Sequence, residues 1–178
     1  MTEQSDTTQG NEGAAQGGSL SHIQRGPDGA RSRMVDVSGK GATERRALAR
    51  ATVEFPPGLL GQVRAGGGPK GPIEEVARVA GVLAAKRTGD LIPMCHPLGL
   101  DVVDVRFEST APDVLEVYCS AGCTGPTGVE MEAMVGASVA ALTIYDMTKA
   151  ASKAIRLGAV ELLEKSGGKS GHWLRPQG

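Results

Sequence analysis

The stretch TGVEMEAMVGASVAALTIYDMTK, residues 127–149, constrains the fold of this chain more than any other feature of the sequence. Residues suited to a buried helix face recur along it at three- and four-residue steps: Met131, Met134, Val135, Ser138, Ala141, Leu142 and Tyr145. Thr127 and Glu130 have the spacing of a capping box, which predicts where the helix starts. The small residues Ala137, Ala140 and Ala141 let another backbone pack closely against this helix. As an exposed face, the small apolar run 133–141 would predict an oligomer.

Charged residues stand near both ends of this predicted helix. Asp146 and Lys149 are one turn apart, so an acid and a base can meet there, although a surface ion pair has the same pattern. Glu132 and Asp146 share one side of the helix but stand roughly 21 Å apart along its axis. They can contact one small substrate only if that substrate is long or if two copies of the chain combine.

Composition excludes several classes of function. The net charge of -1 and the lack of a long basic run argue against nucleic-acid binding, and aromatic residues make up only 3% of the chain. The longest uncharged helical stretch, 133–145, is too short to span a bilayer, and the start of the chain lacks the layout of a secretory signal. Three cysteines suggest no disulfide framework. These features predict a cytoplasmic, single-domain protein.

Two segments of the chain are predicted to lack regular structure. Residues 1–32 have almost no large apolar side chains, which predicts a disordered tail. Prolines and glycines at 56–58 and 66–71 are expected to break regular structure between them, and Lys70 lies in the second group. That loop is either a solvated connection or a lid that brings an ammonium group onto phosphates.

The remaining segments predict an α+β fold. Alternation predicts strands over 46–55, 102–108, 114–120 and 159–164, the middle two forming a hairpin. A helix is expected over 73–86, with Pro72 in its first turn, Gly89 after its end, and one buried face made of Ile73, Val76, Ala77, Ala80, Leu83 and Ala84. The order strand, helix, two strands, helix, strand predicts an antiparallel sheet with helices packed on it.

Two further motifs carry potential chemistry. Cys95 and His96 stand between Pro93 and Pro97, in a segment that the prolines hold extended, so the two side chains should point to opposite sides. Cys95 with His96 is compatible with a thiolate nucleophile or a metal site, but Cys119 and Cys123 complete no recognisable zinc spacing with them.

The segment KSGGKSG at 165–171 is not a P-loop, because Leu163 stands where that motif needs glycine. It is either an anion-holding turn or a solvated basic tail.

Several long motifs together resemble one family, the cyclic pyranopterin monophosphate synthases of molybdenum cofactor synthesis. They are MVDVS at 34–38, AAKRTGDLIPMCHPL, TGVEMEAMVGASVAALTIYDMTKA and LLEKSGGKSG, in that order along the chain. The likeness covers residues 33–171 and leaves tails at 1–32 and 172–178. It implies a ferredoxin-like α+β fold and a homohexamer built as a trimer of dimers.

The resemblance also implies site residues. The family's catalytic aspartate and lysine correspond to Asp146 and Lys149. Its loop lysine and late lysine correspond to Lys70 and Lys165, and the arginine of its first strand falls near Arg45. Its substrate-contacting segments correspond to Met94, Cys95, His96, Glu130, Met131 and Glu132. Relatives often carry an aspartate at the position of Pro72, a departure that can stiffen the lid.

The reaction implied is a lyase step. A cyclised dihydro-GTP, made by a radical GTP cyclase, is rearranged to cyclic pyranopterin monophosphate with release of pyrophosphate. The resemblance implies no cofactor, and whether a divalent ion travels with the pyrophosphate is left open. Two alternatives from other classes remain at this point: a non-catalytic nucleotide-binding module, and a structural oligomer whose small-residue helix is an assembly face.

Overall fold

The computed structural model describes residues 23–27, 29–66 and 71–176, and it divides the chain into two units at Arg33 and Met34. The first unit contains two antiparallel strands, β1 (Ile23–Gly26) and β2 (Gly29–Ser32). The tail was expected to be disordered up to residue 32, so this hairpin is a correction. Gly29 takes a positive φ of 106°, a turn conformation that glycine adopts without strain, and the turn lets the backbone groups pair.

The second unit contains the predicted succession of elements. It has strands β3 (Thr43–Glu54), β4 (Val102–Ala111), β5 (Val114–Gly125), β6 (Arg156–Ser166) and β7 (Trp173–Leu174), and helices α1 (Leu59–Gly66), α2 (Ile73–Lys86), α3 (Thr88–Leu91) and α4 (Glu130–Thr148). The predicted strands, the hairpin and the two long helices are confirmed. The strands extend further than their alternating patterns suggested.

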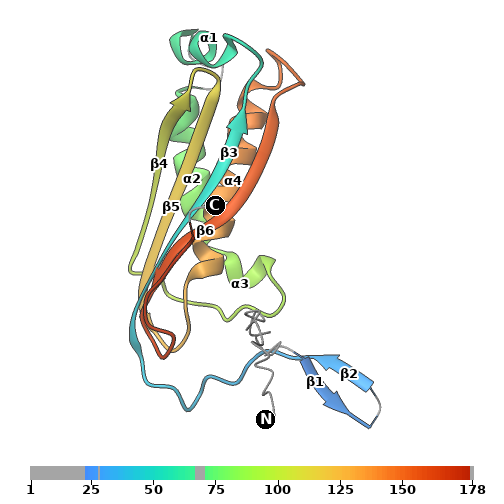
Figure 1. Cartoon of the computed structure of the whole chain (residues 1–178), viewed down its shortest axis with the longest axis vertical. Coiled ribbons are helices and arrows are strands. Elements are labelled where there is room, and N and C mark those ends of the chain that lie inside the picture. The colour runs from blue at the N-terminus through green and yellow to red at the C-terminus, as the bar shows by residue number, and fades with distance from the viewer. Residues whose placement is uncertain (1–22, 28, 67–70, 177–178) are drawn as a thin grey trace, which may run out of the picture. The chain divides into compact units, whose positions relative to one another are not determined.

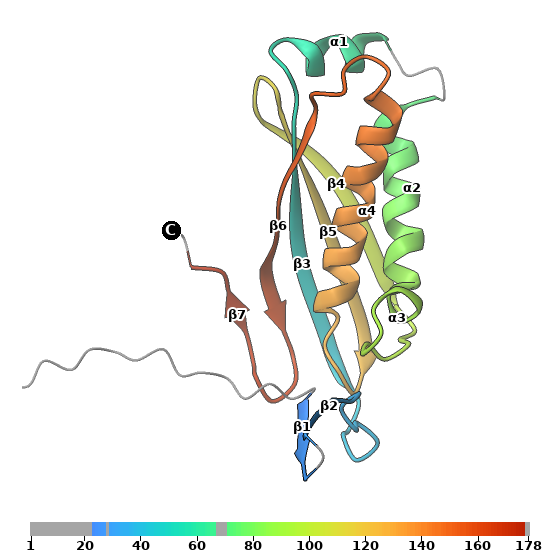
Figure 2. The same ribbon diagram turned by 90° about the vertical axis from the view of Figure 1, so that its right-hand side faces the viewer.

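The sheet is antiparallel throughout its described pairings, in the order β4-β5-β3-β6-β7. The elements β3, α2, β4, β5, α4 and β6 form a βαββαβ unit with the ferredoxin-like strand order, which confirms the fold class. Helices α2 and α4 lie side by side on one face of the sheet (Figures 1 and 2). Strand β7 extends the sheet beyond β6, where a tail from residue 172 was expected.

The core between sheet and helices is made largely of small side chains. Alternate residues of β3 are buried, namely Ala47, Ala49, Ala51 and Val53. A Cβ atom on Gly81 of α2 would lie 3.0 Å from the backbone oxygen of Gly136 on α4, and one on Gly136 would overlap the sulfur of Cys119. The two helices therefore approach closely because glycine and alanine line their contact, as the small residues of α4 predicted.

The face of α4 that is buried differs from the predicted one. Leu142 is 53% exposed and Met131 36%, while the buried side is formed by Ala133, Ala137, Ala140, Ala141 and Ile144. Packing against α2 in the same chain selects small residues over large ones. The idea that 133–141 is an exposed assembly face is therefore wrong. On α2, likewise, Val76 and Leu83 are exposed although they were expected in the core.

The observed helix boundaries also differ from those that the sequence predicted. Helix α4 starts at Glu130 after Val129, with no side-chain cap, so the capping box of Thr127 and Glu130 does not form. Helix α1 occupies part of the segment that prolines and glycines were expected to keep irregular, because the backbone N–H groups of Gly58 and Leu60 find the carboxylate of Asp113. Helix α3 follows α2 directly and includes Gly89.

Candidate functional site

The C-terminal end of α4 carries an ion pair. Lys149 Nζ donates to Asp146 Oδ1 at 2.5 Å, which confirms that these side chains meet one turn apart. Both are about half exposed, and Lys149 is the residue that ends the helix. The hydrogen bond to Asp146 is the main cause that raises the pKa of Lys149, so the ammonium form is favoured. This pair can hold a proton beside an open surface.

The other end of α4 joins two strands of the sheet. Lys165 Nζ on β6 donates to Oε1 of Glu130 at 2.8 Å. Arg45 on β3 donates to the carbonyl oxygens of Gly125 and Pro126, at 3.3 and 3.4 Å, in the segment that leads into α4. Arg45, Glu130 and Lys165 thus come together, from positions far apart in the sequence, because β3 is hydrogen-bonded to both β5 and β6.

These three residues line one polar pocket of about 310 Å³. The lining comprises Lys40, Arg45, Arg46, Pro126, Thr127, Gly128, Glu130, Lys165, Ser166, Gly167, Lys169 and Ser170. It holds five cationic side chains and one carboxylate. The sequence analysis included Lys169 only as part of the segment 165–171, and it missed Lys40 and Arg46. Arg46 lies on β3 and Lys40 in the segment just before it, and the fold brings both to the pocket that the glycine-rich turn after β6 also lines, which no local sequence pattern signals.

The glycines at 167 and 168 bring that turn against β3. Both have positive φ, 99° and 68°, a conformation that side chains with a Cβ rarely adopt. A Cβ on Gly167 would overlap the carbonyl of Glu44, and one on Gly168 would overlap the guanidinium of Arg45. The turn therefore packs on Arg45 and holds Lys165 and Lys169 at one wall of the pocket.

A buried acid lies beside this pocket. Glu132, on the first turn of α4, is 3% exposed, and burial is the main cause that raises its pKa, with a further contribution from the charge of Glu130. Burial first, and the charge of Glu132 second, raise the pKa of the Cys95 thiol. Both effects keep Cys95 protonated, so its environment does not favour a thiolate nucleophile.

His96 and the two methionines are placed around the same end of the molecule. The Nε2 atom of His96 lies 2.8 Å from the carbonyl oxygen of Val35, in the MVDVS segment. Met94 is half-buried, and Met131 is partly exposed beside Glu132 on α4. Lys70 lies outside the described residues, so the structure neither adds it to the pocket nor removes it.

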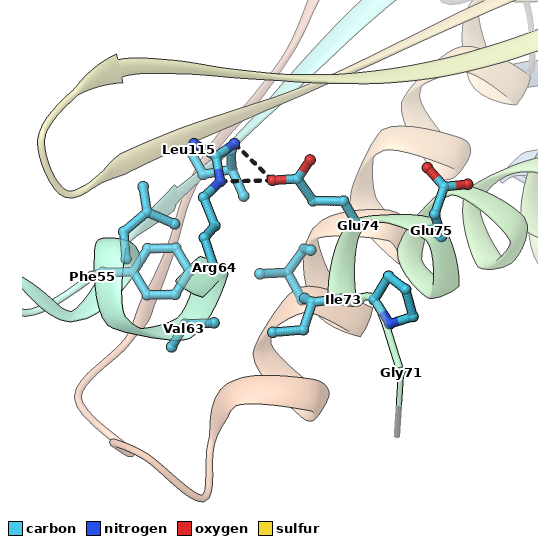
Figure 3. A pocket seen from close by; sticks show the side chains of 11 residues that line it. Phe55, Val63, Arg64, Gly71, Ile73, Glu74, Glu75 and Leu115 are labelled. Atoms are coloured by element: carbon cyan, nitrogen blue, oxygen red, sulfur yellow. Dashed lines mark hydrogen bonds and ion pairs between the residues drawn. The ribbon is translucent and has the colours of Figure 1, made fainter. Parts of the chain in front are cut away.

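A larger cavity, of about 690 Å³, lies near the opposite end of α4 and contains none of the predicted site residues. Figure 3 shows its mainly apolar walls, including Phe55, Val63, Ile73 and Leu115, with the ion pair between Arg64 and Glu74 at one side. Among the described residues that line this cavity, Arg64 is the cation, and it is already paired with Glu74, so these walls are a poor match for a phosphorylated ligand.

Among the described residues, no group of three or more His, Cys, Asp or Glu side chains is arranged to hold a metal ion. Over the same residues, no helix has the length and apolar character needed to cross a membrane.

Comparison with known proteins gives the same family as the sequence motifs. The model of the MoaC family matches residues 34–168. Cyclic pyranopterin monophosphate synthase from Novosphingobium aromaticivorans is 52% identical over 154 residues, which cover 86% of this chain and 96% of the relative. The protein of that name from Chloroflexus aggregans is 47% identical over 161 residues, covering 90% and 98%. A match across nearly the whole second unit, at this identity, means that the chain belongs to the MoaC family.

Proposed function

We propose that this chain converts (8S)-3′,8-cyclo-7,8-dihydroguanosine 5′-triphosphate to cyclic pyranopterin monophosphate, a step of molybdenum cofactor biosynthesis. The observation that carries the proposal is the family membership, with relatives of that name aligned over most of the chain. The charged groups at the two ends of α4 have the chemistry that this reaction needs. A radical GTP cyclase supplies the substrate in the cytoplasm.

Asp146 and Lys149 serve as the acid and base of the rearrangement. Opening the purine-derived ring and closing the pyran ring require protons to move at carbon–nitrogen bonds, and a positioned acid–base pair typically contributes about 10²–10⁴-fold to such steps. The hydrogen bond of 2.5 Å between the two side chains supports this role, since each can exchange a proton through the other. Both groups are also exposed enough to reach a substrate.

Closing the cyclic phosphate expels pyrophosphate, and positive charge must stabilise that leaving group. In this account Lys70, Lys149 and Lys165 supply it, with Arg45. The cationic pocket beside Lys165 supports the assignment, because its lining has a large excess of positive over negative side chains. The protein needs no resident cofactor in this mechanism, and a divalent ion can accompany the pyrophosphate.

The guanine-derived part of the substrate is assigned to the buried end of the site. Glu132 can accept hydrogen bonds from its amino groups, and His96 can donate or accept one. Met94, Cys95 and Met131 provide the less polar surface beside them. Burial raises the pKa of Glu132, which supports this choice because its carboxyl group takes up a proton more readily than an exposed glutamate does.

In this proposal each active site combines the residues at the C-terminal end of α4 in one subunit with the residues at the N-terminal end of α4 in another. Glu130 and Lys149 are 19 residues apart at opposite ends of one continuous helix, which is about 28 Å long, so a single chain cannot close both around one small substrate. A dimer that pairs the end of one α4 with the start of another solves the problem. We propose that such dimers assemble into a hexamer.

The direct test is to incubate the purified chain with the cyclised dihydro-GTP and follow two products, pyrophosphate and cyclic pyranopterin monophosphate. Both should appear in equal amounts. Binding without either product would instead support a nucleotide-binding module, and neither binding nor turnover would leave a structural oligomer.

A further inference from the structure

The cationic pocket at the start of α4 is unevenly paired. Lys165 is bound to Glu130, and Arg46 is bound to Glu44 at 2.7 Å. Arg45 donates hydrogen bonds to the backbone carbonyl oxygens of Gly125 and Pro126. Lys40 and Lys169 have no ion-pair partner within the described ranges 23–27, 29–66 and 71–176. The lining therefore holds several like charges close together, an arrangement that costs free energy unless an anion joins them.

Glu130 is the one carboxylate in this lining, and its conformation is specific. Its carboxylate folds back over the residue two positions before it, so closely that a Cβ on Gly128 would overlap both oxygens. From there it reaches Lys165, which lies 35 residues away in the sequence. The side chains of this pair are only 28% and 29% exposed. Glu130 thus places a negative charge inside the pocket, against Lys165. This position is not explained by helix capping, because the side chain of Glu130 makes no cap hydrogen bond.

We propose that Glu130 occupies, in the empty pocket, the place that a phosphate group of a diphosphate-bearing ligand takes when it binds, and that Lys40 and Lys169 are further ligands of that group. This inference rests on the proposed function, because it assigns the pocket to the phosphate chain of the substrate and to the pyrophosphate that leaves. On binding, Lys165 exchanges the carboxylate of Glu130 for phosphate oxygens.

The ligand class follows from charge and donors. Three lysines and Arg45 offer several N–H donors around about 310 Å³, and Ser166 and Ser170 add hydroxyl groups. A diphosphate has enough oxygens and negative charge to satisfy this set, whereas a single carboxylate does not. The backbone N–H groups at the start of α4, which have no side-chain cap, favour an anion there as well.

The exchange makes an unusual prediction, namely that removing a pocket residue strengthens binding. Titration calorimetry with inorganic pyrophosphate should give a dissociation constant about three- to tenfold lower for Glu130→Gln than for the unchanged protein, because the competing charge is gone while the shape is kept. Lys40→Met and Lys169→Met should each raise it about tenfold. Matched controls are Glu75→Gln and Lys86→Met, which lie outside the pocket and should change it less than twofold.

Inorganic phosphate separates a diphosphate site from a general anion site. In the unchanged protein it should bind at least about tenfold more weakly than pyrophosphate, since it meets fewer of the donors. Weaker pyrophosphate binding in Glu130→Gln, in a variant whose melting temperature is unchanged, would overturn the exchange. Unaltered binding in both Lys40→Met and Lys169→Met would overturn their assignment.

These results are independent of the proposed activity. If the protein forms the cyclic product but these substitutions leave the dissociation constant for pyrophosphate unchanged, the pocket assignment is wrong and the proposed function stands. If the substitutions act as predicted but no product forms from the cyclised nucleotide, the pocket stands and the function fails.

Discussion

At the scale of single residues, the chemistry of this chain depends on a few charged groups in contrasting surroundings. Asp146 and Lys149 are exposed and paired with each other, whereas Glu132 is buried beside two cysteines whose pKa values it helps to raise. Exposure allows proton exchange with a substrate. Burial makes the charged form of Glu132 unfavourable, so the charged residue lowers the free energy of unfolding of the protein.

The exposed pair gives the first prediction. Asp146→Asn and Lys149→Ala should each lower the turnover of the cyclised nucleotide by about 10²-fold or more, because each removes a group that exchanges protons. The melting temperature should change little, since an exposed ion pair contributes roughly 0–1 kcal/mol. Steady-state turnover and thermal unfolding measure the two effects. Glu75→Gln and Lys86→Ala are matched exposed controls, and activity within threefold of theirs would contradict the assignment.

The buried acid gives a prediction about pH. The folded chain holds the proton of Glu132 more tightly than the unfolded chain, so the unfolding free energy falls as pH rises from the ordinary glutamate pKa through the raised folded value. Glu132→Gln removes this loss and should stabilise the protein at pH 7 by about 1 kcal/mol, or roughly 2–4 °C in Tm.

Thermal unfolding at several pH values measures the effect. The gain should shrink as the pH falls from the raised folded value to about 4.3, and below that it should be absent because Glu132 is then neutral in both the folded and the unfolded chain. A gain that does not depend on pH would mean that burial of the charge is not its cause, and Glu75→Gln should show none.

At the scale of elements, the main feature is the close contact between α2 and α4. Because Gly81 and Gly136 face each other, the helices approach nearer than larger residues allow.

The sequence predicted some elements of the fold better than others. Alternation in β3 and β5 identified the sheet, since one face is buried in full. The buried face of α4 could not be found by hydrophobicity, because the helix has large apolar residues on its exposed side as well.

The candidate site was partly predictable for a related reason. Motif resemblance identified Glu130, Lys165 and Arg45. Arg46 reaches the pocket through the pairing of β3 with β6, and Lys40 lies in the segment that leads into β3. Strand register depends on long-range pairing, which a local pattern does not contain. The capping box predicted for Thr127 and Glu130 does not form, because α4 begins at Glu130 and Val129 occupies the N-cap position.

The helix contact is tested by filling it. Gly136→Ala should destabilise the protein by about 1–3 kcal/mol, because the new Cβ would overlap the sulfur of Cys119. Combining it with Cys119→Ala should recover part of that loss, measured by denaturant unfolding as a double-mutant cycle. Gly61→Ala, on α1 with open space around it, is the control and should be neutral or stabilising. Strict additivity in the cycle would show that the two side chains do not compete for space.

At the scale of the whole molecule, the exposed surface supports assembly. Val76, Val79 and Leu83 form an apolar stripe on the outer side of α2, with Val79 58% exposed. Leu142 is exposed on α4, the helix beside it. Large apolar residues grouped on neighbouring helices favour contact with another chain. This stripe, and not the small residues of α4, is therefore the surface through which we expect the chain to form an oligomer.

The stripe gives a prediction about assembly. The protein should be oligomeric at micromolar concentration, and the joint substitution Val79→Glu and Leu83→Glu should lower its mass in light scattering, because burying two charges in an interface is unfavourable. The protomer should stay folded, since both side chains are exposed. A mass unchanged by this substitution would place the interface elsewhere, and a monomeric unchanged protein would remove the argument for a shared site.

The most direct test of the account is to mix two inactive variants. Asp146→Asn damages the end of α4, and Lys165→Ala damages the pocket at its start. If each site combines the two ends from different subunits, chains mixed and reassembled in equal amounts should regain about a quarter of the normal pyrophosphate release, because hybrid dimers hold one intact site. Mixing Asp146→Asn with Lys149→Ala, both at the same end, should regain nothing. Failure of the first mixture, with subunit exchange confirmed by mass spectrometry, would contradict a site built from both ends of α4 in different subunits.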